Sequence, residues 1–254
     1  MSGPQRITYL GHATLLIETE GVRLLTDPLL RNWVWHLRRR TGPVDPKLYQ
    51  NLDAVLISHM HWDHLDLPSL RLLDPDTHII APHGAASLLH KNGFRWVTEL
   101  GVGDTIDVGS VPIMATYAMH DGARVRYTKA ADCLGYLIGS SYTVYFAGDT
   151  ELFPEMADLA SHLDVALLPV WGWGPTLGRG HMDPQRAAQA AQLLQPRVAI
   201  PIHWGTLFPF ALDRVLPKFL VEPPELFASF TSSYAPNVRT KIVPPGDAVY
   251  LRDL

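Results

Sequence analysis

Four side chains that can bind a metal ion lie within six residues, in the segment HMHWDH at positions 59–64. The segment directly follows the apolar run 54–58, which is typical of a strand buried on both faces. Because side chains two residues apart on an extended chain point to the same side, His59 and His61 can face one ion. After the chain turns, Asp63 and His64 can point elsewhere. A solvated polar loop is the alternative, but it would crowd these groups at a strand end without any gain.

Three further residues of the same kind each follow a β-type run. His120 comes after the run 113–119, Asp149 after 144–147 and His203 after 198–202. Ligands from the carboxyl ends of several buried strands can meet in one crevice of an α/β protein. Each of the three could also be an ordinary loop residue. Together with segment 59–64 they exceed the ligands of one tetrahedral zinc and suit two cations, about 3.5–4 Å apart, that share a carboxylate.

Strands and helices alternate along the chain and must position these residues. We expect strands over 6–19, 22–26, 54–58, 77–81, 134–138, 143–147, 165–170, 197–202 and 248–251, and one or two strands over 104–117. We expect helices over 67–73, 84–91, 153–163, 184–194 and 222–232. Asp66 and Asp183 are the expected N-caps of the first and fourth of these helices, each with a proline in the first turn. The pattern suggests two similar halves packed together, and because no linker separates them we expect one domain over 1–254.

The composition agrees with a globular protein and excludes several other classes. Of the 254 residues, 47% are hydrophobic and 18% charged, which excludes a disordered or fibrous chain. The net charge of −4 gives no overall basic field, so nucleic acid is not an expected partner. No apolar run reaches the roughly 18 residues of a membrane span, and residues 1–6 do not resemble a signal peptide, so we expect a cytoplasmic protein. Cys133 stands alone before an apolar strand and is expected in the core rather than as a nucleophile.

The order of these motifs, from Gly11-His12 to His203, resembles the metallo-β-lactamase fold superfamily. The resemblance implies a four-layer αβ/βα sandwich, with two sheets face to face, helices outside and the site at one edge. It also implies seven metal ligands in two groups with a shared carboxylate. The first cation would be bound by His59, His61 and His120, and the second by Asp63, His64 and His203, with Asp149 bridging. Zn²⁺ is the expected metal, and Mn²⁺ or Fe²⁺ would also suit these ligands.

Sequences around the expected ligands resemble one branch of that superfamily. The segments 10–14 (LGHAT), 26–28 (TDP), 180–184 (GHMDP) and 201–206 (PIHWGT) are similar to the group that contains L-ascorbate phosphate lactonase and N-acylphosphatidylethanolamine phospholipase D. The resemblance implies a small-molecule ester, phosphoester or lactone substrate. Our main hypothesis is a dinuclear hydrolase that attacks a phosphodiester with a metal-bridging hydroxide. A lactonase, for example one that acts on a sugar-phosphate lactone, is the alternative, and a catalytically inert metal-binding protein is the alternative from another class.

Several residues outside the expected ligand set are also candidates for the site. His181, in a Gly-rich loop, and Asp63 are the candidate catalytic residues, although His181 could equally be exposed and inactive. His12 could orient a ligand or be a structural histidine, and Asp27 is expected to fix a turn beside the site. The remaining histidines have no supporting pattern and are expected on the surface or in helices: His36, His78, His83, His90 and His162.

Leu29–Arg40 combines tryptophans with arginines and follows the segment 26–28, so it could overhang the site. Trp33, Trp35 and Leu37 beside Arg38–Arg40 could bind an acyl or aryl group next to an anion. A membrane-surface contact, a subunit contact or an ordinary packed loop are the alternatives. Four more tryptophans adjoin the motif loops and predict an apolar-walled pocket: Trp62, Trp171, Trp173 and Trp204. Either Arg124 or Arg179 could neutralise a phosphate, or both could be surface charges.

Overall fold

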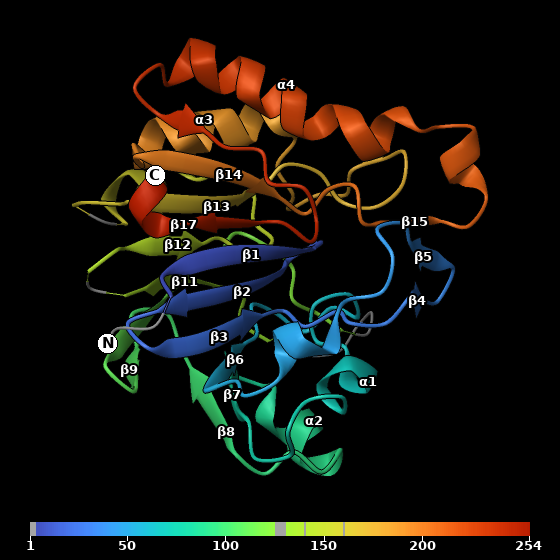
Figure 1. Ribbon diagram of the computed structural model, residues 1–254, viewed down its shortest axis with the longest axis vertical. Helices are drawn as coiled ribbons and strands as arrows, with labels where there is room; N and C mark the ends of the chain where they lie inside the picture. The colour runs from blue at the N-terminus through green and yellow to red at the C-terminus, as the bar shows by residue number, and fades with distance from the viewer. Residues whose placement is uncertain (1–3, 125–130, 140, 160) are drawn as a thin grey trace.

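The computed structural model describes residues 4–124, 131–139, 141–159 and 161–254 (Figure 1). Two seven-stranded sheets form its centre. The first contains, in spatial order, β17 (Ala248–Tyr250), β1 (Arg6–Gly11), β2 (Thr14–Thr19), β3 (Val22–Thr26), β6 (Ala54–Leu56), β7 (His78–Pro82) and β8 (Val97–Leu100). The second contains β16 (Arg239–Thr240), β14 (Val198–Ile202), β13 (Val165–Pro169), β12 (Val144–Phe146), β11 (Leu134–Ile138), β10 (Val111–Tyr117) and β9 (Thr105–Val108).

Helices cover the outer face of each sheet, and a small third sheet lies at one end. The helices are α1 (Leu67–Leu70), α2 (Ala86–Lys91), α3 (Pro184–Leu194) and α4 (Lys218–Tyr234), with 3₁₀ turns η1 (Pro46–Tyr49), η2 (Pro154–Asp158), η3 (Leu212–Arg214) and η4 (Leu251–Asp253). The third sheet contains β15 (Leu207–Pro209), β5 (Leu37–Arg39) and β4 (Trp33–Val34). Figure 1 shows α3 and α4 beyond one sheet, α1 and α2 beyond the other, and the third sheet to the right.

Alternation of side chains along the strands produces the layers. In β13, Val165 and Leu167 point into the core between the two sheets, whereas Ala166 packs in the cluster under α3. In β2, Leu15 belongs to the central core, while Leu16 faces the cluster beneath α1 and α2. Both sheets are therefore apolar on both faces, as buried parallel strands require. The expected four-layer sandwich with helices outside is confirmed.

The carboxyl ends of the parallel strands meet at one edge of the molecule. In the first sheet β3, β6, β7 and β8 run parallel, and in the second β12, β13, β14 and β16 do. The loops after β6, β12 and β14 carry Asp63, Asp149 and His203, among other expected ligands. This edge is where ligands bind in open α/β sheets, so the fold places the loops in reach of one another.

Two helix starts follow the sequence prediction. Asp66 accepts a hydrogen bond from Ser69 N at 3.1 Å at the start of α1, and Asp183 accepts one from Arg186 N at 2.8 Å at the start of α3. The end of α1 differs, because this helix stops at Leu70. Helix α4 begins at Lys218, before the expected 222, and continues through two prolines that donate no backbone hydrogen bond.

Three sequence predictions are wrong in their detail. The expected helix 153–163, of which residue 160 lies outside the described part, is only the turn η2, because one 3₁₀ turn already brings Phe153 and Met156 into the core beneath α3. The expected strand 6–19 is two strands, because Gly11 and His12 adopt positive φ and reverse the chain. His78 was expected on the surface or in a helix but is buried in strand β7, where its ring stacks on Trp96.

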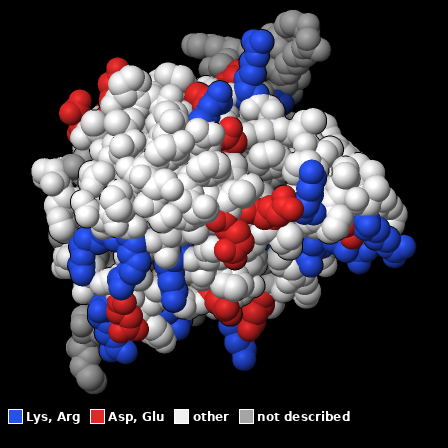
Figure 2. Space-filling view, turned by 90° about the horizontal axis from the view of Figure 1, so that it is seen from above, with Lys and Arg blue, Asp and Glu red and all other residues white. Residues whose placement is uncertain are grey.

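The segment Leu29–Arg40, which was expected to overhang the site, contains a hairpin. Its strands β4 and β5 pair with each other, and β5 pairs with β15. Leu29, Val34 and Leu37 are buried with Leu207 in a separate apolar cluster that anchors the hairpin. No described helix is long and apolar enough to cross a membrane. On the face seen in Figure 2, basic side chains stand in separate groups among acidic and uncharged ones and form no continuous basic surface.

Candidate metal centre

All seven expected ligands gather at the carboxyl edge of the sheets, in two neighbouring clusters. The first cluster joins the loop after β6 to the segment after β10. His61 Nδ1 lies 3.0 Å from His59 Nε2 and 3.1 Å from His120 Nε2. The three nitrogens therefore point at a common centre. Ligand atoms that share a tetrahedral zinc at about 2.0–2.1 Å would lie at similar separations, about 3.3 Å.

The second cluster joins the same loop to the segment after β14. His64 Nε2 lies 3.2 Å from His203 Nε2, and Asp63 Oδ2 lies 3.9 Å from His64 Nε2. Asp149, from the segment after β12, stands between the two clusters. Its Oδ1 is 3.2 Å from His203 Nε2, whereas its Oδ2 is 3.1 Å from His64 Nε2 and 3.9 Å from His59 Nε2.

A hydrogen bond on the outer side of each ring turns four of the histidines toward this centre. The Nδ1 partners are Ser58 Oγ for His59 at 2.9 Å, Asp27 Oδ2 for His64 at 2.7 Å, Gly180 O for His120 at 2.7 Å and Trp171 O for His203 at 3.0 Å. The carbonyl and carboxylate partners can only accept, and Ser58 Oγ donates to Asp27 Oδ2 at 2.5 Å, so each Nδ1 carries the proton. When the ring is neutral, its Nε2 is then left as a lone pair that faces inward.

These lone pairs test whether the residues fit a cation. A proton on His61 Nδ1 could satisfy either His59 Nε2 or His120 Nε2, but not both. Asp149 adds a second observation, because its Oδ1 is buried and makes no hydrogen bond with any described group. Buried acceptors that face one another cost free energy unless a donor or a cation lies between them. The donor set of imidazole and carboxylate groups therefore fits divalent cations such as Zn²⁺.

The electrostatics of the histidines agree with a ligand role. Burial lowers the pKa of His59 and of His61. Burial also lowers the pKa of His120 to about 4 and that of His203 to about 3. These four rings are consequently neutral at pH 7, the form in which imidazole binds a metal.

His64 and Asp149 show how strongly the centre demands positive charge. Burial alone would lower the pKa of His64, but the charges of Asp149, Asp27 and Asp63 raise it well above its usual value. Burial would raise the pKa of Asp149, yet His203 and His64 hold it well below its usual range. In the metal-free chain a proton on His64 thus supplies part of the charge that a bound cation would provide.

The local backbone lets these residues approach one another. A Cβ on Gly148 would lie 2.7 Å from the Ser58 Cβ, and its φ of +61° is in the left-handed region, so only glycine fits before Asp149. His12 and His203 also have positive φ, 58° and 63°, and His203 N donates to His12 O at 2.8 Å. Non-glycine residues in this region cluster at functional sites, where the surrounding structure maintains the strain.

Comparison with known proteins identifies the family to which this chain belongs. Residues 22–204 match the model of the beta-lactamase superfamily domain. A UPF0173 metal-dependent hydrolase of Methanopyrus kandleri is 31% identical over 251 residues, which cover 96% of this chain and 98% of that protein. This chain belongs to the UPF0173 metal-dependent hydrolase family. Another member, from Koribacter versatilis, is 33% identical over 213 residues, 79% of this chain and 84% of that protein. Igni18, a metallo hydrolase of Ignicoccus hospitalis, matches with a TM-score of 0.72 and 27% identity over 96% of this chain and 97% of its own.

Asp27 and His12 support the ligands of this UPF0173 chain. The expectation of a turn at Asp27 missed its main contacts, because its side chain also accepts from Ser58 N at 2.7 Å and so joins the start of the ligand loop to His64. His12 is buried, with Nε2 3.0 Å from Asp63 Oδ2 and its ring centre 3.9 Å from that of His203. His12 could thus orient Asp63 or join the second cluster as a further ligand.

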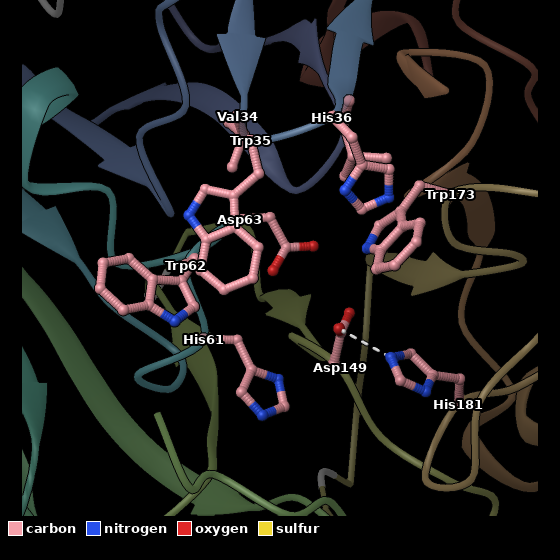
Figure 3. A pocket seen from close by; sticks show the side chains of 10 residues that line it. Val34, Trp35, His36, His61, Trp62, Asp63, Asp149, Trp173 and His181 are labelled. Atoms are coloured by element: carbon pink, nitrogen blue, oxygen red, sulfur yellow. Dashed lines mark ion pairs between the residues drawn. The ribbon is translucent and has the colours of Figure 1, made fainter. Parts of the chain in front are cut away.

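A pocket of about 310 Å³ opens over the centre of the UPF0173 chain. Its lining includes His61, Asp63, Asp149 and His181, which Figure 3 shows together. His181 Nε2 lies 3.2 Å from Asp149 Oδ2. Burial would lower the pKa of His181, but the hydrogen bond and charge of Asp149 raise it overall. His181 therefore lies beside the expected ligands and lines the pocket.

The pocket walls only partly match the sequence prediction. Trp35, Trp62 and Trp173 line the pocket, as does His36, which no sequence pattern had singled out. Its only signal was its position in the segment predicted to overhang the site.

Other aromatic and basic candidates lie elsewhere. Trp171 stacks on Phe219, and Trp204 packs near Tyr9. Arg124 does not face the pocket as a phosphate ligand: its guanidinium lies 3.9 Å from the Trp62 ring centre and donates to the carbonyls of Met60 and Leu65. It therefore holds the ligand loop in place. Arg179 is exposed, and Cys133 is buried, as expected for a core residue.

Proposed function

We propose that this UPF0173 chain binds two divalent cations and hydrolyses a phosphodiester or a related phosphoester. The position of Asp149 carries the proposal, since its oxygens face His203 on one side and His64 on the other, between the two clusters. Membership of a family named for metal-dependent hydrolysis supports the reaction class. The description of Igni18 as a metallo hydrolase supports it as well.

The residues that would hold the cations follow from the two clusters. One cation would be held by His59, His61 and His120, the other by Asp63, His64 and His203, with Asp149 shared between them. Zn²⁺ is the expected metal, and Mn²⁺ or Fe²⁺ would suit the same donors. When bound, two such cations supply a water of near-neutral pKa as the nucleophile and stabilise the negative charge of the transition state.

His181 and Asp63 would handle protons and orientation in the pocket. His181 Nδ1 faces the carbonyls of Gly178 and Arg179 at 3.3 and 3.0 Å, so its proton is on that side and Nε2 points to the reacting region. In its protonated form, His181 Nε2 can donate to the oxygen of the leaving group. Asp63 presents one oxygen to His12, which leaves the other to accept a hydrogen bond from an incoming water.

The charge of the pocket favours a diester over a sugar-phosphate lactone. None of the described residues that line it is Lys or Arg. A separate phosphate on a lactone would find no Lys or Arg there, whereas the single charge of a diester would be neutralised at the cation centre. The resemblance to the branch with L-ascorbate phosphate lactonase and N-acylphosphatidylethanolamine phospholipase D supports either reaction, and its motif residues His12, Asp27 and His181 all reach the site.

Substitution of Asp149 tests this function. With metal-loaded protein and bis(4-nitrophenyl) phosphate, we expect Asp149→Ala to lower kcat/KM by more than the roughly 10–100-fold that loss of an outer partner causes. Asp53→Asn is the matched control, since this position is exposed and the side-chain oxygen of the new Asn could still accept the hydrogen bond from Arg23 N. Near-normal activity of Asp149→Ala would contradict the proposal. Faster turnover of lactones than of diesters would favour the lactonase, and two bound metals without activity on either panel would favour an inert metal-binding protein.

A further inference from the structure

The walls of the pocket over the metal centre are aromatic and apolar, and their arrangement bears on the substrate. Figure 3 shows Trp35 and Trp62 on one side, and His36 with Trp173 on the opposite side. Asp63 and Asp149 lie between these two walls. A group bound between the walls would therefore have one end at the reacting centre.

The β4–β5 hairpin supplies one residue to each wall. Trp35 lies in the turn of the hairpin and has a φ of +52°. Its ring centre is 5.5 Å from that of Trp62, and the two rings are tilted relative to each other. The next residue, His36, meets Trp173 edge to face at 5.5 Å. His36 O accepts a hydrogen bond from Phe210 N at 3.0 Å, and Val34 is buried in the hairpin's own apolar cluster. The two walls are thus held apart by a single anchored turn.

The electrostatics of the pocket select an uncharged substituent. No Lys or Arg is present among the described lining residues, so a second anionic group has no permanently charged cationic side chain to pair with there. A cationic group would lie beside the proposed dications and be repelled by them. Arg124 already occupies one face of the Trp62 ring, with its guanidinium carbon 3.9 Å from the ring centre. What remains favourable is apolar contact with the indole rings.

The size of the pocket selects a ring over a long chain. A volume of about 310 Å³ is at the lower end of the range of about 300–1,000 Å³ for small-molecule sites. The ester group and one ring would occupy much of such a volume, whereas a long acyl chain would extend beyond it. A flat ring also offers its faces and edges to Trp35, Trp62 and Trp173, and aromatic pairs at 4.5–7 Å gain about 0.5–1.5 kcal/mol beyond their buried area.

We propose that the pocket between the β4–β5 hairpin, Trp62 and Trp173 binds the uncharged aromatic substituent of a monoanionic phosphoester. The natural substrate is then a phosphodiester with an aryl substituent rather than a lipid, a sugar phosphate or a choline ester. This inference rests on the proposed function, because it presumes that the ester group binds at the two cations.

Phosphinates test the inference without turnover, because they carry one negative charge and have no bond that the enzyme can hydrolyse. Calorimetric titration of the zinc-loaded protein would compare methyl(phenyl)phosphinate with dimethylphosphinate, hexyl(methyl)phosphinate and a methylphosphinate that carries a trimethylammonioethyl group. We expect the phenyl compound to bind at least about tenfold more tightly than each of the others, because only its ring matches the walls. Competition with bis(4-nitrophenyl) phosphate would show that it binds at the reacting centre.

Two variants of the same hairpin locate the ring. Trp35→Ala should weaken the binding of methyl(phenyl)phosphinate at least about fivefold and leave the affinity for dimethylphosphinate unchanged. Because Trp35 is 69% exposed, its loss should not unfold the protein. Trp33→Ala is the matched control, since Trp33 is exposed, packs against Phe210 and does not line the pocket. It should bind all four compounds as the wild type does.

The outcomes separate the inference from the proposed function. Equal binding of the phenyl and dimethyl compounds, or equally tight binding of the hexyl or ammonium compound, would overturn the inference while the proposed function stands. Equal losses in Trp33→Ala and Trp35→Ala would overturn it as well. If no phosphinate binds and no diester is hydrolysed by zinc-loaded protein, both the inference and the proposed function are wrong.

Discussion

At the scale of single residues, the outer contacts of the histidines decide which nitrogen faces the metal centre. In four rings Nδ1 is hydrogen-bonded to an oxygen, which orients the ring. The backbone carbonyls of Gly180 and Trp171 can orient a ring in this way just as a carboxylate can. The positions of the candidate ligands could be predicted from the sequence, because few residue types bind divalent metals and these residues follow predicted strands. The role of Asp27 could not, because a short Thr-Asp-Pro segment indicates a turn equally well, and only the fold shows that His64 lies against it.

Asp27→Asn is predicted to weaken metal binding through the tautomer of His64. The Asn oxygen can still accept from Ser58 N, and its amide nitrogen then faces His64 Nδ1 as a donor. His64 Nδ1 must become the acceptor, so the proton moves to Nε2 and blocks the lone pair that should hold the cation. We expect a loss of about 10–100-fold in zinc affinity, measured by competition with a chelating dye. Asp53→Asn should bind zinc like the wild type, and unchanged affinity in Asp27→Asn would contradict this role.

At the scale of elements, long buried runs were predicted well and short or bent ones were not. The strands around Val55 and Ile200 show continuous apolar sequence because both of their faces are covered. The hairpin of β4 and β5 has strands of only two and three residues, too short for any periodic signal. Its conformation depends on tertiary partners, β15 and the cluster around Leu207, which lie far along the chain. The pocket walls that it carries could therefore not be placed from the sequence.

Asp164 connects the starts of β12 and β14, at the end of the sheet opposite the site. This buried carboxylate accepts from Thr143 N at 3.0 Å before β12 and from Arg197 Nη1 at 3.1 Å before β14. Burial would raise the pKa of Asp164, but these hydrogen bonds and one from His162 lower it overall. We predict that Asp164→Asn lowers the free energy of unfolding by about 1–3 kcal/mol at pH 7, measured by urea denaturation.

The pH dependence of that difference follows from the sign of the shift. Because the folded-state pKa of Asp164 lies below its unfolded value of about 3.9, the stabilisation is fully present above that value and is lost as the pH falls through the folded pKa. The difference in stability between wild type and Asp164→Asn should be constant from pH 5 to 7, about one to three pH units above the unfolded pKa, and should narrow below about pH 4. Glu155→Gln, at an exposed position, should change stability by no more than about 0.5 kcal/mol. A gap that widens in acid would contradict this account of Asp164.

At the scale of the whole molecule, the site exists because two sheets meet along one edge. The first sheet supplies the ligand loop after β6, and the second supplies His120, Asp149 and His203 from three of its strand ends. The order of motifs in the sequence was enough to predict the four layers through the resemblance to a known superfamily. The walls of the pocket depend on segments from both halves of the molecule. His36 comes from the first half and Trp173 from the second, and only the assembled fold brings their rings into contact.

The central claim is that seven side chains from both halves of the molecule hold a pair of cations. Anomalous X-ray diffraction at the zinc edge, on crystals grown with excess zinc, tests it most directly. We expect two peaks about 3.5–4 Å apart, one among His59, His61 and His120 and the other against His64 and His203, with Asp149 between them. A single peak, or none among these residues at full zinc saturation, would contradict the account.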